Sequence, residues 1–226
     1  IAASHSDSPC WKIKADMPEN EGCRRLSVEG YGGMIMASWL DRPLTVGGRV
    51  LVKTPDGVQS RLVYIDRDLL VIPSLAIHFQ RDVNKGKVFN PQIDMQPLWG
   101  PAGSRTLTDL VCEELGITAA EILDWDLQLI TRQAPVQIGP DNEYFMAPRI
   151  DDLECAATTL LAFLDASGEA DSACAPIWAM FDNEEVGSSS RMGAESSFLR
   201  DVLDRILDAV PHSGQAAARA MANSFM

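Results

Sequence analysis

The hydrophobic pattern of the chain changes character near residue 147, and this change most restricts the folds that the sequence can adopt. From about 25 to 80 the sequence is rich in β-forming residues, punctuated by Gly and Pro, as in RLSVEGYGG and SRLVYIDRDLLVI. After 147 a helical pattern leads into a continuous apolar run, and further helical patterns follow. The chain therefore divides into a mostly β part, about 17–146, and a C-terminal part in which helices flank a strand.

Shorter motifs within the β-rich part predict individual elements. PDG at 55–57 is a turn sequence, and WDLQLI at 125–130 alternates as a strand does. TLTDLVCEELG, which begins at 106, has apolar residues at helical spacing, and TAAE at 118–121 is a capping-box start for a helix. We expect two short helices among the strands of this part.

The C-terminal part predicts three helices and one buried strand. APRIDDLECAATTLLAFLDASG is a turn followed by a strong helix that Gly168 closes. PIWAMF at 176–181 is a continuous apolar run, which is typical of a strand buried on both faces. SSFLRDVLDRILDAV and GQAAARAMANS predict two more helices, and FM at 225–226 resembles the start of another strand. We therefore expect the fold to continue beyond residue 226.

The composition argues against several classes of protein. The 226 residues are 46% hydrophobic, which is enough for a substantial core. The net charge is −13 and there is no basic run, which argues against a nucleic-acid or anionic-membrane surface. No apolar stretch approaches the roughly 20 residues that span a bilayer. IAASHSDSP lacks the charged start of a signal peptide and an initiator methionine, so we expect the natural N-terminus to lie upstream.

The cysteines indicate a reducing environment. Five are scattered along the chain without paired CxxC spacing. This pattern fits a cytoplasmic location and argues against a structural zinc knuckle.

Three short polar motifs next to apolar segments could carry chemistry. In SHSDSP, a strand period of two places His5 and Asp7 on one face, where the carboxylate could support a metal-bound imidazole. The alternative is a polar turn before Pro9. Asp151 and Asp152 stand at the start of a helix, where acidic residues also occur simply as caps.

The third motif is the adjacent pair Glu184 and Glu185, directly after PIWAMF. On an extended backbone, neighbouring side chains point to opposite sides, so the two carboxylates would face different partners. One could bind a metal while the other removes a proton from water. The alternative is a solvated turn. Taken together, the three motifs form a His/Asp/Glu set at strand ends and loops, the usual place for ligands in an α/β fold.

Six sequence blocks, in order, resemble the aspartyl aminopeptidase family of dinuclear zinc exopeptidases. They are SHSDSPCWKIK, VEGYGGMIMASWLDRPLTVGGRV, PSLAIHFQRDVN, APRIDDLECA, FDNEEVGSSSRMGAESSFL and NSFM, and they cover essentially the whole chain. The resemblance implies an α/β fold with a three-layer catalytic domain, residues 1–16 and 147–226. A β-rich dimerisation domain, 17–146, would be inserted into it.

The resemblance also implies roles for individual residues. His5 would bind one zinc ion, with Asp7 supporting it. Asp151 would bridge both metals, and Glu185 would bind the other zinc. Glu184 would be the general base that takes a proton from the attacking water.

His78, in LAIHFQR, matches a histidine that family members lend to the active site of a neighbouring subunit; the alternative is an ordinary histidine of a β-domain. The resemblance further implies a homo-oligomer that is based on dimers, with a dodecamer as the larger assembly.

Two features depart from the family pattern. The family usually has Asn where this chain has Asp152, so an extra carboxylate stands beside the bridging position. The resemblance also implies further ligands beyond residue 226, because His5, Asp151 and Glu185 are too few for two zinc ions. We therefore do not expect residues 1–226 alone to be active.

The function that these observations favour is a cytoplasmic zinc aminopeptidase that removes N-terminal, preferably acidic, residues from peptides. Two alternatives remain open at the level of sequence. One is a scaffold or assembly element without catalysis, and the other is a different dinuclear zinc hydrolase, such as a carboxypeptidase or a deacylase.

Overall fold

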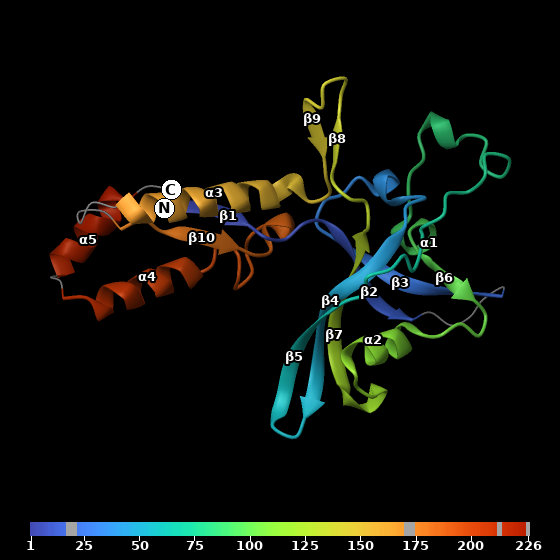
Figure 1. The fold of residues 1–226 in the computed structure, drawn as a ribbon, viewed down its shortest axis with the longest axis horizontal. Helices are drawn as coiled ribbons and strands as arrows, with labels where there is room; N and C mark the ends of the chain where they lie inside the picture. The colour runs from blue at the N-terminus through green and yellow to red at the C-terminus, as the bar shows by residue number, and fades with distance from the viewer. Residues whose placement is uncertain (17–21, 170–174, 212–213, 225–226) are drawn as a thin grey trace. The chain divides into compact units, whose positions relative to one another are not determined.

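The structure is a computed structural model, and it describes residues 1–16, 22–169, 175–211 and 214–224. The chain forms two compact units, which can be followed by colour in Figure 1. Unit 1 consists of Ile1–Ser8 and Arg149–Met226, and unit 2 consists of Pro9–Pro148. The two ends of the chain thus fold together, and the residues between them form a second body.

Unit 2 contains a six-stranded sheet of order β5-β4-β7-β2-β3-β6, in which every neighbouring pair is antiparallel. Its strands are β2 (Cys10–Asp16), β3 (Cys23–Tyr31), β4 (Leu44–Thr54), β5 (Gly57–Tyr64), β6 (Leu98–Pro101) and β7 (Ile122–Thr131). The family resemblance predicts that residues 1–16 belong to the catalytic domain. The structure instead puts β2 in this sheet, because β2 pairs with both β3 and β7.

The core of unit 2 lies on this sheet and includes Trp11, Leu26 and Leu127, all fully buried. Helix α2 (Leu107–Leu115) adds three buried residues to it, Leu107, Leu110 and Val111. A capping box of Thr106 and Asp109 begins the helix, and Gly116 ends it in the left-handed region.

Several motifs of the β-rich part are confirmed. PDG forms the tight connection between β4 and β5, where Thr54 pairs with Gly57. WDLQLI lies within β7. TAAE does start a helical turn with a capping box, but this turn is the short 3-10 helix η3 (Ala119–Glu121).

The remaining elements of unit 2 are short. They are η1 (Met36–Trp39), η2 (Val83–Lys85), α1 (Pro91–Asp94), and the two-stranded hairpin of β8 (Val136–Ile138) and β9 (Tyr144–Met146).

Unit 1 contains a parallel pair of strands, β1 (Ala2–His5) and β10 (Trp178–Phe181), with His5 beside Phe181 in the register. Its helices are α3 (Ile150–Glu169), η4 (Glu184–Val186), α4 (Phe198–Ala209) and α5 (Gly214–Asn223). Helix α3 packs against both strands, and the indole of Trp178 donates to Thr159 Oγ1 at 3.0 Å. Because the strands are parallel, their carboxyl ends lie at the same edge, and the residues that follow them come together.

Three details of unit 1 differ from expectation or lie outside the structure. PIWAMF does form a strand, but Met180 is 44% exposed, so among the described residues only one face of β10 is covered. Helix α3 continues through Gly168, which keeps a negative φ, to Glu169. The expected strand at 225–226 lies outside the described residues. No helix in the described ranges is both long and apolar enough to cross a membrane.

Candidate metal centre

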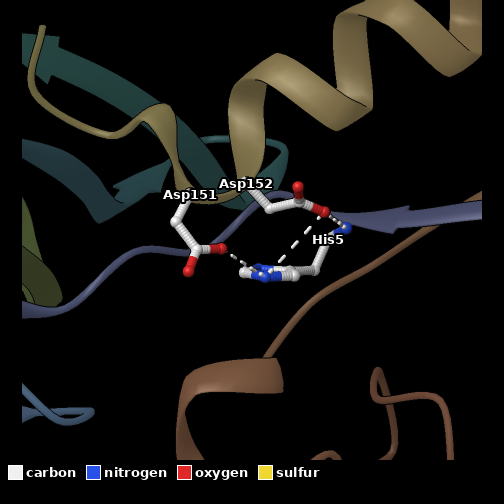
Figure 2. A group of neighbouring side chains, drawn as sticks. All are labelled: His5, Asp151 and Asp152. Carbon is white, nitrogen blue, oxygen red and sulfur yellow. Dashed lines mark hydrogen bonds and ion pairs between the residues drawn. The ribbon is translucent and has the colours of Figure 1, made fainter. Parts of the chain in front are cut away.

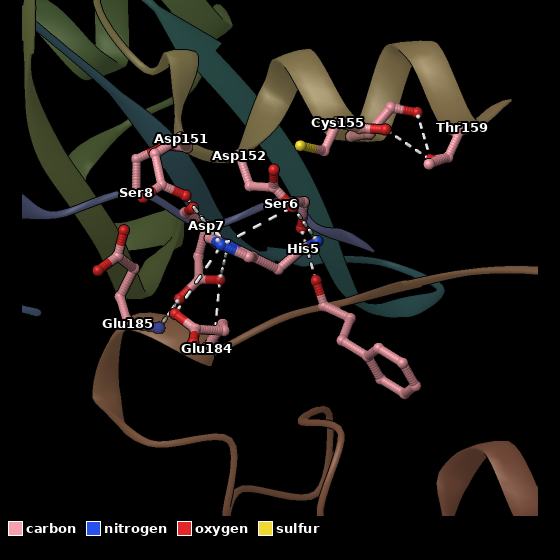
Figure 3. A network of polar contacts seen from close by, with 12 residues as sticks. His5, Ser6, Asp7, Ser8, Asp151, Asp152, Cys155, Thr159, Glu184 and Glu185 are labelled. Atoms are coloured by element: carbon pink, nitrogen blue, oxygen red, sulfur yellow. Dashed lines mark hydrogen bonds and ion pairs between the residues drawn. The ribbon is translucent and has the colours of Figure 1, made fainter. Parts of the chain in front are cut away.

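The polar residues of unit 1 converge where β1 and β10 end and α3 begins. His5 is the last residue of β1, Asp7 follows in the next loop, and η4 follows β10. Asp151 and Asp152 lie in the first turn of α3. Figure 3 shows these residues gathered around the imidazole of His5. The fold therefore brings the three polar sequence motifs to one place.

The two ring nitrogens of His5 have different partners. Nδ1 lies 3.1 Å from the carbonyl oxygen of Asp7 and 3.2 Å from its Oδ1. Nε2 lies 3.2 Å from Asp151 Oδ1. A dashed line marks this contact in Figure 2. When Nδ1 carries the proton and donates it to Asp7, Nε2 keeps its lone pair for a metal ion.

Asp7 links β1 to the loop after β10. Its side chain is only 7% exposed. Oδ1 accepts the main-chain N–H of Glu184 at 3.1 Å, and Oδ2 accepts that of Glu185 at 3.2 Å. The same carboxylate thus contacts the imidazole and holds the start of η4. Its role in supporting a metal ligand stays a prediction.

Asp151 and Asp152 differ strongly in exposure and in contacts. The side chain of Asp151 is 85% exposed, and its main-chain carbonyl accepts a hydrogen bond from Ser8 Oγ at 3.1 Å. The side chain of Asp152 is 14% exposed, and its Oδ2 accepts the main-chain N–H of His5 at 3.1 Å. The peptide bond between the two residues is cis. Asp151 is therefore open to a ligand, whereas Asp152 is held against β1.

The backbone of the glutamate pair has a different conformation from the extended one that we expected. Glu184 and Glu185 open the 3-10 helix η4, after a left-handed Asn183, and are not extended. Successive side chains of a 3-10 helix are about a third of a turn apart rather than opposite. The two side chains still leave the turn in different directions (Figure 3). Oε2 of Glu184 lies 3.8 Å from His5 Nε2.

The charges around His5 favour a cation. Burial acts to lower the pKa of His5, but the negative charges of Asp152 and Asp7 and the hydrogen bond of Asp7 outweigh it, so the pKa is raised. Burial raises the pKa of Glu185, and the charge of Asp151 adds to this rise. Burial acts to raise the pKa of the Asp152 carboxyl, but hydrogen bonds from the Cys155 thiol and from the His5 main chain outweigh it, so the pKa is lowered.

The donor atoms fit a zinc ion. His5, Asp151 and Asp152 each offer one ligand atom, and these atoms lie within 4.8 Å of one another. An imidazole nitrogen with carboxylate oxygens is a donor set that zinc accepts. The structure thus brings His5 to Asp151, as expected, and adds Asp152, which the sequence marked only as an extra carboxylate. Glu185 is half-buried nearby but is not in that close group.

His78 lies in unit 2, on an exposed turn after β5. Its expected role at the active site of another subunit stays a prediction.

Proteins of known sequence match the chain over its whole length. The family described as "Aminopeptidase I zinc metalloprotease (M18)" matches residues 1–226. The probable M18 family aminopeptidase 2 of Clostridium acetobutylicum is 37% identical over 235 residues, which cover 100% of this chain and 54% of that protein. The protein of the same name from Streptomyces avermitilis is 41% identical over 235 residues, which cover 99% of this chain and 52% of that protein. The chain therefore spans about half the length of these curated relatives.

Solved structures share the fold. The cryo-EM structure of the Ape4 and Nbr1 complex matches with a TM-score of 0.82 and 34% identity, over 94% of this chain and 45% of that one. The structure of Chaetomium thermophilum mApe1 matches with a TM-score of 0.77 and 31% identity, over 94% and 53%. The structure of the S. cerevisiae mApe1 dodecamer matches with a TM-score of 0.76 and 26% identity, over 94% of this chain and 50% of that one. These matches confirm the α/β fold class and the family resemblance. The chain belongs to the M18 family, the aminopeptidase I zinc metalloproteases.

Proposed function

We propose that the protein to which this chain belongs is a zinc-dependent aminopeptidase. It removes N-terminal residues, preferably acidic ones, from peptides and works with two zinc ions in each complete active site. The observation that supports this most strongly is the geometry of His5, whose Nδ1 is held by Asp7 while its Nε2 faces Asp151. A buried carboxylate behind an imidazole that faces another carboxylate is the usual arrangement of a metal-binding histidine.

Three residues of this chain would hold the metals. His5 would bind one ion through Nε2, Glu185 would bind the other, and Asp151 would bridge them. The 85% exposure of the Asp151 side chain leaves its oxygens accessible to both ions. Zinc in such a site polarises the scissile carbonyl and lowers the pKa of water.

Glu184 would act as the general base. Its side chain is 53% exposed, and its Oε2 lies 3.8 Å from His5 Nε2, so it borders the same space as the metal ligands. Its carboxylate takes a proton from the attacking water and passes it to the leaving amine. The main-chain N–H groups of Glu184 and Glu185 donate to the Asp7 carboxylate, and these hydrogen bonds hold the backbone of Glu184 close to His5.

The β-rich unit would serve assembly. We propose that unit 2 is a dimerisation domain that presents His78 to the active site of the partner subunit. Dimers would associate further into a larger assembly, and the similar S. cerevisiae mApe1 is a dodecamer. The exposure of the turn around His78 supports this assembly, because it leaves the histidine accessible to a partner subunit. The cysteines have no paired spacing in the sequence, which supports a cytoplasmic location.

The test uses the full-length protein and chromogenic peptides that differ only at the N-terminus. We expect release of an N-terminal Asp or Glu to be faster than release of Leu or Ala. We also expect a chelator to abolish cleavage and zinc to restore it. Cleavage of N-acetylated peptides from the carboxyl end would contradict the proposal and favour a carboxypeptidase. Zinc binding without any peptide cleavage would favour a scaffold.

A further inference from the structure

Asp152 has contacts that distinguish it from an ordinary acidic residue at a helix start. A carboxylate there normally binds main-chain N–H groups of its own helix. The carboxylate of Asp152 instead reaches another element: its Oδ2 accepts the main-chain N–H of His5 in β1 at 3.1 Å, while the thiol of Cys155, in the same helix, donates to the same carboxylate. The contact with His5 joins residues 147 positions apart in the sequence. Asp152 therefore ties the start of α3 to the end of β1.

The location of this contact matters because His5 is the last residue of β1 and carries the metal-facing nitrogen. Oδ2 of Asp152 lies 3.9 Å from His5 Nε2, and its side chain is 14% exposed. Figure 2 shows Asp152 and Asp151 on two sides of the imidazole. The carboxylate thus fixes the main chain beneath the ligand and places a negative charge near the ligand atom.

We propose that Asp152 is a positioning residue of the metal centre, which holds His5 through its main-chain N–H and strengthens zinc binding through its charge. This inference rests on the proposed zinc site. It treats Asp152 as a partner of His5 and not as a zinc ligand, although its carboxylate offers one of the three close donor atoms, because its side chain is 14% exposed and held by the His5 N–H whereas that of Asp151 is 85% exposed.

The two parts of the proposal can be separated by two substitutions. Asp152→Asn keeps the shape and a carbonyl oxygen that can accept the His5 N–H, but it removes the charge. Asp152→Ala removes both. Glu154→Gln is the matched control, since it removes one negative charge from an exposed residue in the same turn of α3.

The experiment measures the full-length protein in two ways. Competition with a chelator gives the zinc affinity and the number of ions bound. Thermal unfolding of the metal-free protein gives its melting temperature. Neither measurement depends on peptide cleavage, so a failure of the aminopeptidase proposal would not obscure the result.

We expect Asp152→Asn to lower the zinc affinity about 10- to 100-fold, which is typical when a residue that contacts a metal ligand is replaced. The number of bound ions and the melting temperature of the metal-free protein should not change. Asp152→Ala should also lower the metal-free melting temperature by about 2–4 °C, because the His5 N–H loses its partner. Glu154→Gln should match the wild type.

Several results would overturn the inference. If Asp152→Asn bound zinc as tightly as Glu154→Gln, the charge would have no role. If it lost one whole ion, Asp152 would be a ligand. If Asp152→Ala and Asp152→Asn melted at the same temperature, the hydrogen bond to His5 would not hold the main chain. A wild-type protein that bound no zinc would overturn the proposed function together with this inference.

Discussion

His5 illustrates how single contacts decide the chemistry of the site. Its Nδ1 is engaged by Asp7, and its Nε2 is directed at Asp151. The imidazole is only 13% exposed, so its orientation is fixed by these neighbours rather than by solvent. The remaining carboxylates differ in exposure, and this difference suggests separate roles for them.

Glu184→Gln should keep its zinc and lose nearly all turnover. The substitution preserves the shape of the side chain but removes the group that accepts the proton, which costs about 10²–10⁴-fold in rate. Elemental analysis beside a peptidase assay measures both quantities. Loss of zinc in this variant would mean that the roles of Glu184 and Glu185 are reversed.

Asp151→Asn should weaken both metal ions together, because one bridging carboxylate serves two ions. The loss of affinity should exceed the roughly 10- to 100-fold typical of outer-shell partners. Zinc titration of the variant provides the check. One site that kept its full affinity would argue against a bridge.

At the residue scale, the sequence predicted which side chains come together, but it did not predict the backbone conformation of every one of these residues. The period of a strand predicted that His5 and Asp7 lie together, and the structure confirms that they meet, although β1 ends at His5 and Asp7 lies in the loop that follows. The same reasoning was wrong for Glu184 and Glu185, which lie in a 3-10 helix. Nothing in the apolar run before them marks where the strand gives way to a turn, and left-handed Asn183 makes that change.

At the scale of elements, short polar contacts hold the segment between β5 and β6 of unit 2. Lys87 Nζ donates to Asp94 Oδ1 at 2.8 Å, and the main-chain N–H of Asn90 donates to Asp94 Oδ2 at 2.8 Å. The hydrogen bond from Lys87 contributes most, and that from Asn90 adds to it; together they hold the pKa of Asp94 below its ordinary value. A carboxyl whose pKa is lowered on folding stabilises the protein above its ordinary pKa, and this contribution is lost as the pH falls through the folded value.

Asp94→Asn should therefore destabilise the full-length protein at pH 7 by about 1 kcal/mol, and by less below the ordinary carboxyl pKa of 3.8, where the carboxyl of the unfolded chain takes up its proton. The comparison is made at pH 7 and about pH 3. Thermal unfolding at the two pH values measures the difference. Asp82→Asn is the control, because the Lys85–Asp82 pair is 79% and 78% exposed and should change little. An equal loss at both pH values for Asp94→Asn would refute the linkage.

Sequence signals for elements succeeded where the cause is local. The capping box at Thr118 and the PDG turn depend on a few adjacent residues, and both are present. The burial of β10 was predicted less well, since burial depends on elements that pack from elsewhere in the fold. Its parallel pairing with β1 likewise joins segments more than 170 positions apart, as the register of Ala2 with Trp178 shows.

At the scale of the whole molecule, the chain divides into a unit that carries the proposed metal ligands and a unit that carries His78. The change of hydrophobic pattern near 147 predicted this division closely, since the structural boundary lies between Pro148 and Arg149. The first boundary was predicted less well, because β2 has no local feature that assigns it to either unit.

Mixing of inactive subunits tests whether His78 acts in trans. His78→Ala and Glu184→Gln proteins, each nearly inactive alone, should regain activity when dissociated together and reassembled. Some mixed dimers then join an intact Glu184 site to an intact His78 of the partner. If the histidine acted within its own subunit, no mixed site would be complete and activity would not return.

The most direct test of the central claim is the zinc content of the full-length protein with and without His5. Elemental analysis of the wild type should find two zinc ions in each subunit. His5→Ala should hold fewer zinc ions and lose peptidase activity, because Nε2, which faces Asp151 while Asp7 holds Nδ1, is the proposed ligand atom. A His5→Ala protein with its full zinc content and full activity would show that the metal centre lies elsewhere.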